Sequence, residues 1–426
     1  MNQSTIIYDL NNQDRYGYYT VGDQKTYSKL QAIDYYKINN KPIRWHYNED
    51  IYKKFDWTQE PTASLDDLYQ RRAQQIRDQY DYLVLWYSGG ADSHNILQTF
   101  VQAGIYIDEI AQYTMLEAHG GDKYSSMNEE VYKTSIPETQ KLLDTNPIYK
   151  TTKHRVVDIT NLEVDYLSDT GNKWDHFYKV NTYYCPSCIS RYHIRESVDD
   201  YRQMIDAGKK VCFIYGVEKP VMKQDQQGWW LQFTDGQDNA VSAWAQMQNF
   251  PGDYNEFFYW APTMPEISAK QAHVIKKYCQ GVTIKDVDNI HLSLGKPFVD
   301  KWGTQLRDNT LTGSCFVFEN NGQTFSLTLR GLHRLLYSYW NPDSIVQGKP
   351  NGHMFPDRDL WLHKSNASDI GQKYYTGGIV WLRQHVRDVD PSLWREYKYD
   401  PTKTVYNGGI AKFYNTYLIG PRTINL

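Results

Sequence analysis

The stretch that most constrains the fold of this chain is residues 82–104, YLVLWYSGGADSHNILQTFVQAG. Residues 83–87 form an unbroken apolar run, which is typical of a strand buried on both faces. After the SGGADS turn, apolar residues recur at helical spacing, and Gly104 lies where such a helix would end. The sequence therefore predicts a strand, a glycine turn and a helix in succession.

The predicted turn has the chemistry of a phosphate-binding site. Gly89 and Gly90 have no Cβ, so the backbone can approach an anion closely. The first N–H groups of the helix point toward the same place, where the helix dipole favours negative charge. Ser88 and Ser93 add hydroxyl donors. Asp92 would repel a phosphate, unless Mg²⁺ lies between them or the carboxylate caps backbone donors of the turn.

S-G-G-x-D-S after a buried strand resembles the PP-loop of the N-type ATP pyrophosphatases, at every position of residues 88–93. That superfamily includes GMP synthetase, NAD synthetase, the synthetase domain of asparagine synthetase, tRNA thiolation enzymes and PAPS reductase. The chain lacks G-x-x-x-x-G-K-[ST], so a Walker-type site is not predicted. The resemblance implies Mg²⁺ near Asp92 and an ATP pyrophosphate group held by backbone N–H groups and hydroxyls of Ser88, Gly89, Gly90, Ala91 and Ser93.

Further strands are expected near residues 107, 154 and 211, with helices between them. Strand–helix–strand units of this kind make right-handed crossovers and an open, doubly wound, mostly parallel sheet. The fold class is therefore α/β, and we assign residues 64–235 to a PP-loop ATP-binding domain. Residues 1–63 are predicted to form a β-rich lead-in, and residues 236–426 a mixed α+β region for the acceptor substrate or an accessory role.

Local sequence patterns predict the positions of several turns and helices. Gly22-Asp23 predicts a hairpin turn in the lead-in, and residues 320–322 predict another in the C-terminal region. Ser64 and Asp67 have capping-box spacing at the start of a helix. Residues 267–278 and 332–339 are expected to be helical.

Two further places extend the predicted ATP site. In the resembled superfamily, backbone at the end of the second strand holds the adenine, which implies Thr114 and Met115 here. After the fourth strand, Lys219 could reach a phosphate and Glu218 could reach Mg²⁺. A solvated Glu-Lys pair is the alternative for that turn.

The five cysteines, an odd number, do not indicate a disulfide framework. Cys185 and Cys188, with His193 nearby, have the spacing of ligands for Zn²⁺. An Fe–S cluster, redox or sulfur chemistry, and a purely structural turn are the alternatives. Cys212 lies within an apolar strand pattern and is expected to serve packing.

Composition sets the remaining expectations. A net charge of −4 implies no bulk attraction to nucleic acid or anionic membranes. The 37 Tyr and 13 Trp are expected to serve packing, with base stacking as the alternative. The amino terminus lacks a signal-peptide pattern and no apolar run approaches membrane-spanning length, so a cytoplasmic protein is predicted. The lead-in would cover the nucleotide domain or form a homodimer contact.

Taken with the resemblance, the residues predict an enzyme that adenylates a substrate oxygen and releases pyrophosphate. A nitrogen or sulfur nucleophile would then displace AMP. The acceptor is open between amide formation on a small molecule, nucleobase or tRNA modification, and a PAPS-reductase-like reaction. The third option lacks a C-terminal catalytic cysteine, because Cys315 is the last cysteine of the chain. An ATP- or AMP-binding protein without turnover is the alternative from another class, and the intact residues 88–93 argue against a decayed site.

Overall fold

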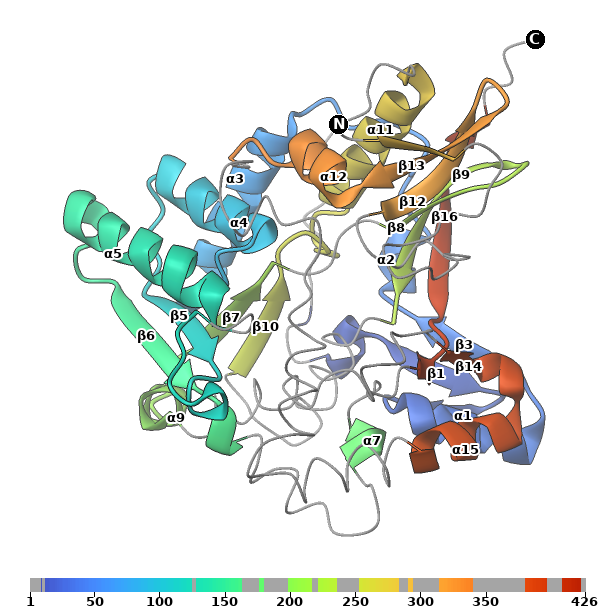
Figure 1. Cartoon of the computed structure of the whole chain (residues 1–426), viewed down its shortest axis with the longest axis horizontal. Coiled ribbons are helices and arrows are strands. Elements are labelled where there is room, and N and C mark those ends of the chain that lie inside the picture. Colours follow the sequence, from blue (N-terminus) through green and yellow to red (C-terminus); the bar gives the residue numbers. More distant parts are fainter. Residues whose placement is uncertain are drawn as a thin grey trace.

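The structure is a computed structural model, and it describes residues 9, 12–124, 128–162, 176–179, 198–216, 221–235, 253–282, 290–293, 314–339, 380–396 and 408–422. Figure 1 shows a sheet with its helices on the left and several smaller antiparallel sheets on the right. None of the described helices has both the length and the apolar character needed to cross a membrane.

The central sheet has five strands, all parallel, in the order β10-β7-β4-β5-β6. This confirms the predicted α/β character and parallel sheet. Strands β4 and β7 have apolar sequences and buried side chains, as expected for strands covered on both faces. The strands are β4 Tyr82–Trp86, β5 Glu109–Thr114, β6 Lys153–Asp158, β7 Val211–Tyr215 and β10 Asp253–Phe257.

The strand order places the glycine turn at a topological switch point. From β4 the chain runs outward to β5 and β6, then returns to place β7 on the other side of β4. Ligands of such sheets bind outside the carboxyl ends of the strands where the order reverses. One edge strand, β10, pairs with β7, although its residues 253–257 belong to the predicted C-terminal region of residues 236–426.

Helices accompany the sheet as the apolar spacing predicted. The predicted capping box at the start of α3 is present, with Ser64 and Asp67 bonded reciprocally. One of the helices expected between the strands runs from Val131 to Thr145, and it begins as a π-helix. The helical segments are α3 Leu65–Gln79, α4 Ala91–Gln102, η2 Glu117–His119, η3 Val131–Ser135, α5 Ile136–Thr145, η4 Pro147–Tyr149, α7 His176–Lys179 and α9 Asp199–Asp206.

The N-terminal region forms an antiparallel sheet with the order β2-β1-β3. Its predicted hairpin is confirmed, and Gly22 in the turn has φ of 60°, where glycine is favoured. The elements are η1 Gln13–Tyr16, β1 Tyr18–Val21, β2 Gln24–Thr26, α1 Lys29–Asn39, β3 Ile43–His46 and α2 Glu49–Tyr52.

The C-terminal half contributes further antiparallel pairs. The predicted hairpin joins β12 to β13, and Asn321 and Gly322 in its turn have φ of 49° and 74°. Strand β16 pairs with one edge of β9, and β8 pairs with the other edge of β9. The elements are β8 Val221–Gln224, β9 Gly228–Thr234, α11 Glu266–Gly281, β11 Ile290–Ser293, β12 Ser314–Asn320, β13 Gln323–Thr328, α12 Leu329–Leu336, α15 Val380–Val389, η6 Pro391–Leu393, β14 Trp394–Glu396, β15 Gly408–Ile410 and β16 Tyr414–Pro421.

Aromatic side chains fill the space between these antiparallel sheets. Phe233 has its ring centroid 4.6 Å from that of Tyr52 and 5.1 Å from that of Trp260. Trp57 and Tyr417 extend the group, with ring centroids 5.1 Å apart. These geometries are those of ordinary aromatic packing, so the described part of the chain uses many of its aromatic residues in the core.

Candidate functional site

The glycine turn connects the carboxyl end of β4 to the first turn of α4. The N–H of Tyr87 donates to the carbonyl of Ala111 at 2.9 Å, which extends the β4–β5 pairing by one residue. Gly89 then has φ of 85°, a conformation that favours glycine. Gly90 is the N-cap of α4 and has no side chain to cover the first N–H groups of the helix. The helix therefore presents a donor-rich, electropositive end at the edge of the sheet.

The two serines of the turn have different positions. Ser93 is 5% exposed, and its Oγ accepts from the N–H of Ser88 at 3.2 Å and donates to the carbonyl of Gly90 at 3.2 Å. Ser88 is exposed, and its Oγ lies 3.1 Å from Oγ of Ser93. Ser93 thus braces the turn from inside, whereas the exposed Ser88 hydroxyl accepts from the N–H of Gly90 at 3.2 Å.

The π-helix η3 forms one wall of the turn. The N–H of Ile136 donates to the carbonyl of Val131, five residues back, just before Pro137, whose missing N–H prevents a regular helical bond. This wide turn brings the backbone N of Ser135 to 3.2 Å from the position that a Cβ on Gly89 would take. Ser135 also donates from Oγ to the carbonyl of Tyr87 at 2.9 Å. Gly89 is therefore favoured by its φ, and a Cβ there would also crowd Ser135.

Gly216, directly after β7, forms the opposite wall. A Cβ on Gly216 would lie 2.9 Å from the backbone N of Ser93 and 3.1 Å from the carbonyl carbon of Asp92. Real Cβ atoms do not approach backbone so closely, so this position admits only glycine without a shift of α4.

Asp92 lies in the first turn of α4, and residues from the C-terminal half surround its side chain. Tyr337 donates from its hydroxyl to Oδ1 of Asp92 at 2.5 Å, and Nε2 of His333 lies 4.0 Å from the same oxygen. Tyr259 donates to the backbone carbonyl of Asp92 at 2.8 Å. Burial raises the pKa of Tyr337 well above its usual value, and the charge of Asp92 adds to this. Tyr337 therefore remains a proton donor at physiological pH.

The donor set beside the turn fits Mg²⁺ bound together with a phosphate. Mg²⁺ prefers one or two carboxylates combined with phosphate oxygens and water. Asp92 supplies one carboxylate, and Glu130 brings another, whose Oε1 lies 3.0 Å from the position that a Cβ on Gly90 would take. Among the described residues, no group of three or more His, Cys, Asp or Glu side chains is placed to hold a metal ion by itself.

The residues predicted to hold adenine lie at the end of β5, one strand away from the turn. The N–H of Met115 donates to Oδ1 of Asn128 at 3.0 Å, and Nδ2 of Asn128 donates back to the carbonyl of Met115 at 3.3 Å. The carbonyl of Thr114 accepts from the N–H of Ile159 at 2.9 Å. A base that used the Met115 backbone would therefore have to displace the fully buried Asn128 amide.

Several predicted site residues lie outside the described part of the chain: Glu218, Lys219, Cys185, Cys188 and His193. Cys212 is a free, fully buried thiol in β7, as expected for a packing residue, and burial raises its pKa. The geometry thus brings together residues 88–93 with Gly216, Ser135 and Tyr337. None of these last three residues belongs to a sequence motif, because each reaches the turn only when folding brings its segment there.

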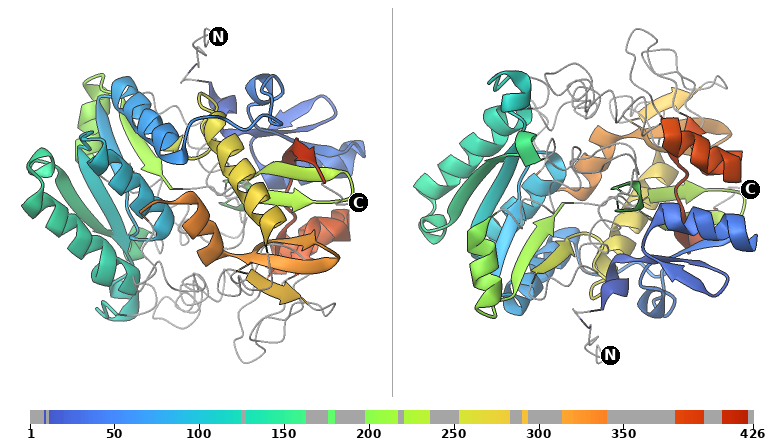
Figure 2. Two further views of the ribbon diagram at one scale, coloured as in Figure 1. Left: turned by 90° about the horizontal axis from the view of Figure 1, so that it is seen from above. Right: turned by 90° about the horizontal axis from the view of Figure 1, so that it is seen from below.

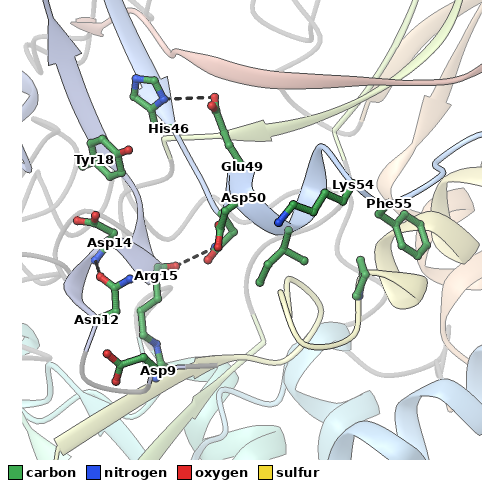
Figure 3. Close-up of a pocket in the computed structure, with 13 residues that line it drawn as sticks. Asp9, Asn12, Asp14, Arg15, Tyr18, His46, Glu49, Asp50, Lys54 and Phe55 are labelled. Carbon is green, nitrogen blue, oxygen red and sulfur yellow. Dashed lines mark hydrogen bonds and ion pairs between the residues drawn. The ribbon is translucent and has the colours of Figure 1, made fainter. Parts of the chain in front are cut away.

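A separate cavity of about 750 Å³ lies in the N-terminal region. Figure 3 shows side chains of η1, β1 and α2 facing this space, with His46 and Glu49 joined by an ion pair. Two of the charged side chains that line it are paired within the protein: Arg15 with Glu256 at 2.8 Å, and Asp14 with Lys25 at 2.5 Å. None of the described residues that line it belongs to the glycine turn.

No protein-family model and no curated protein matches the chain. Among solved structures, the chain is similar to the NH3-dependent NAD synthetase from Campylobacter jejuni subsp. jejuni NCTC 11168 in complex with the nitrate ion, with 12% sequence identity and a TM-score of 0.24. The match covers 37% of this chain and 58% of that chain, so it spans less than two thirds of the synthetase. The function is therefore inferred from residues 88–93 and their surroundings, and not from this similarity.

Proposed function

We propose that this protein binds ATP at the glycine turn and cleaves it between the α- and β-phosphates to adenylate a substrate oxygen. One observation supports this more than any other. The first turn of α4 lies at the carboxyl edge of a parallel sheet, at its switch point, and its N-cap is Gly90, which has no side chain to cap the first N–H groups. That arrangement, combined with the S-G-G-x-D-S pattern, suits an ATP pyrophosphate group.

Each residue of the turn has a distinct role in this proposal. The backbone N–H groups of Gly89, Gly90 and Ala91 and the hydroxyl of Ser88 hold the β- and γ-phosphates. Ser93 keeps the turn rigid through its bonds to Ser88 and Gly90. Asp92 would help to hold a bound Mg²⁺, which would supply positive charge to stabilise the leaving pyrophosphate. Catalysis consists mainly of positioning and charge stabilisation.

The reaction proceeds in two steps. An acceptor oxygen forms a bond to the α-phosphorus, the bond from that phosphorus to the bridging oxygen breaks, and pyrophosphate leaves. A nitrogen or sulfur nucleophile then forms a bond to the carbon that carries the adenylated oxygen, the bond from that carbon to the oxygen breaks, and AMP leaves. The acceptor is proposed to be a small molecule, a nucleobase or a tRNA, held between the turn and the C-terminal region that contacts it through Tyr337 and Tyr259.

Product analysis tests this proposal. The protein is incubated with Mg²⁺ and ATP labelled in the α-phosphate, together with a pool of cellular small molecules and RNA. AMP and pyrophosphate are expected in equal amounts, with a new mass on one acceptor. ADP and phosphate would contradict the assignment, and ATP binding without any product would favour the non-catalytic alternative.

Asp92→Ala is expected to lower Mg²⁺-dependent turnover by more than about 100-fold, because an aligned charge-stabilising group is lost. Asp206→Ala, which removes an exposed carboxylate from α9, serves as the matched control. Equal activity of the two variants would remove Asp92 from the mechanism. Melting temperatures of both variants establish that each is folded.

A further inference from the structure

Helix α12 brings the C-terminal half of the chain onto the predicted phosphate site. Figure 2 shows this helix, in orange, between α4 and α11. Tyr337 directly follows α12, 245 residues away from Asp92 in sequence, and the two side chains are joined by a hydrogen bond of 2.5 Å. Tyr337 is 3% exposed, whereas the Asp92 side chain is 22% exposed. The contact thus joins a fixed donor to a carboxylate that is open to solvent.

The position of Tyr337 is itself fixed by its neighbours. Its ring packs against Tyr259, with centroids 5.3 Å apart, and against His333, with centroids 5.7 Å apart. The carbonyl of Leu336 accepts from the hydroxyl of Tyr69 on α3 at 3.1 Å. The hydroxyl that reaches Asp92 is therefore held by contacts with α12, α3 and the segment that follows β10.

Tyr259 and Tyr337 constrain different parts of Asp92. Tyr259 donates to the backbone carbonyl of Asp92 at 2.8 Å and accepts from Nδ2 of Asn95 at 3.2 Å, so it fixes the first turn of α4. The hydroxyl of Tyr337 donates to Oδ1 of the Asp92 carboxylate and also forms a hydrogen bond with the Tyr259 side chain. The backbone carbonyl of Asp92 is thus bound by the Tyr259 hydroxyl and its carboxylate by the Tyr337 hydroxyl.

We propose that Tyr337 is a positioning residue that orients the Asp92 carboxylate for the divalent cation accompanying ATP. This inference rests on the proposed function, because it assigns the cation to that site. With Oδ1 held by the hydroxyl, rotation of the carboxylate is restricted, and its second oxygen keeps one direction. Partners of this kind commonly change metal affinity by about 10–100-fold when they are removed. The C-terminal half would then be part of the nucleotide site.

Tyr337→Phe removes the hydroxyl and keeps the ring contacts. Calorimetry measures the affinity for ATP at increasing Mn²⁺ concentrations, without turnover. The readout is the Mn²⁺ concentration that gives half of the maximal increase in affinity. The variant is expected to need about 10–100-fold more Mn²⁺, while ATP affinity in the absence of metal stays unchanged. Tyr339→Phe, a partly buried tyrosine two residues further on, is the control and should match the unmodified protein. A Tyr337→Phe protein with an unchanged Mn²⁺ requirement would overturn the inference.

A double-mutant cycle shows whether Tyr337 acts through Asp92. Asp92→Asn is expected to abolish most of the tightening of ATP binding by Mn²⁺. Adding Tyr337→Phe to that variant should then change nothing further, because the carboxylate on which the hydroxyl acts is absent. A full effect of Tyr337→Phe in the Asp92→Asn background would contradict a positioning role.

The same cycle separates the two proposals. If Asp92→Asn retains the full Mn²⁺ effect on ATP binding, the placement of the cation at Asp92 fails, and the inference fails with it. If Asp92→Asn loses the effect but Tyr337→Phe does not, only the inference fails.

Hydrogen exchange on the unmodified protein provides a test that needs no variant. ATP with Mn²⁺ is expected to slow amide exchange in residues 329–339 more than ATP alone does, because the cation loads the carboxylate that Tyr337 holds. Equal protection with and without Mn²⁺ would count against the inference, even if Tyr337→Phe failed to fold.

Discussion

Individual glycines determine how closely two strand ends can approach the first turn of α4. Gly89 combines a φ of 85° with close contact to η3, so any side chain there is strained on two counts. Gly216 has no such φ, and its requirement comes only from the backbone of Ser93 and Asp92. The two glycines therefore serve the site for different physical reasons.

Gly216→Ala provides a prediction at this scale. The new Cβ would lie 2.9 Å from the backbone N of Ser93, which cannot move without displacing α4. We expect ATP affinity to fall at least about tenfold, or ~1.4 kcal/mol, measured by calorimetry. Gly281→Ala is the matched control, because a Cβ there meets nothing within 4 Å. Equal affinities for the two variants would show that α4 is not held against β7.

Other residues at the site were invisible to sequence reasoning for a related cause. Asn128 forms hydrogen bonds with the backbone of Met115, and Tyr337 forms one with the carboxylate of Asp92. Neither residue belongs to a motif, and each becomes relevant only because folding brings it within hydrogen-bond distance. The S-G-G-x-D-S pattern, by contrast, needs only its neighbours in sequence to be interpreted.

At the scale of secondary-structure elements, the start of helix α3 was predicted correctly from local sequence. Ser64 and Asp67 form the expected capping box, because both hydrogen bonds involve residues three apart. Helix α3 matters for the site, since Tyr69 on this helix bonds to the carbonyl of Leu336 beside Tyr337. The π-helix η3 was not foreseen, although Pro137 marks the place where regular bonding fails.

Ser64→Ala tests the contribution of this cap. The variant loses the acceptor for the N–H of Asp67, and the free energy of unfolding is expected to fall by about 1 kcal/mol. Urea denaturation followed by circular dichroism measures the difference. Ser64→Thr keeps a hydroxyl and should restore most of it. A loss as large in Ser64→Thr as in Ser64→Ala would point to a cause other than capping.

At the scale of the whole molecule, a buried ionic group joins the N-terminal region to the central sheet. Glu256 on β10 accepts from Arg15 at 2.8 Å and from Arg72 on α3 at 2.5 Å, and Tyr80 also donates to it. Burial alone would raise the pKa of Glu256, but the two guanidinium groups outweigh burial, and the pKa is lowered. A second buried pair, Lys29 with Asp235, connects α1 to the end of β9 at 2.6 Å.

Glu256→Gln is therefore expected to destabilise the protein by about 3–5 kcal/mol at neutral pH, since it leaves two buried cations without their anion. The folded pKa of Glu256 lies below the unfolded value of about 4.3. Its stabilisation is thus fully present above that pH and is lost as pH falls through the folded pKa.

Denaturation curves measured across pH check both parts of this prediction. The difference in stability between the unmodified protein and Glu256→Gln should shrink as pH falls below about 4. Glu319→Gln, which disrupts an exposed pair with Arg422, should cost less than about 1 kcal/mol. A pH-independent difference for Glu256→Gln would contradict the lowered pKa.

The sequence by itself determined the features that depend on near neighbours. The buried strand, glycine turn and helix of residues 82–104, the Ser64 cap and both hairpin turns follow from apolar spacing and backbone preferences of adjacent residues. Tertiary structure alone decided that residues 253–257 complete the sheet, that Gly216 must be glycine and that Tyr337 reaches Asp92. These depend on distances between segments far apart in the chain, which the local pattern of residues does not encode.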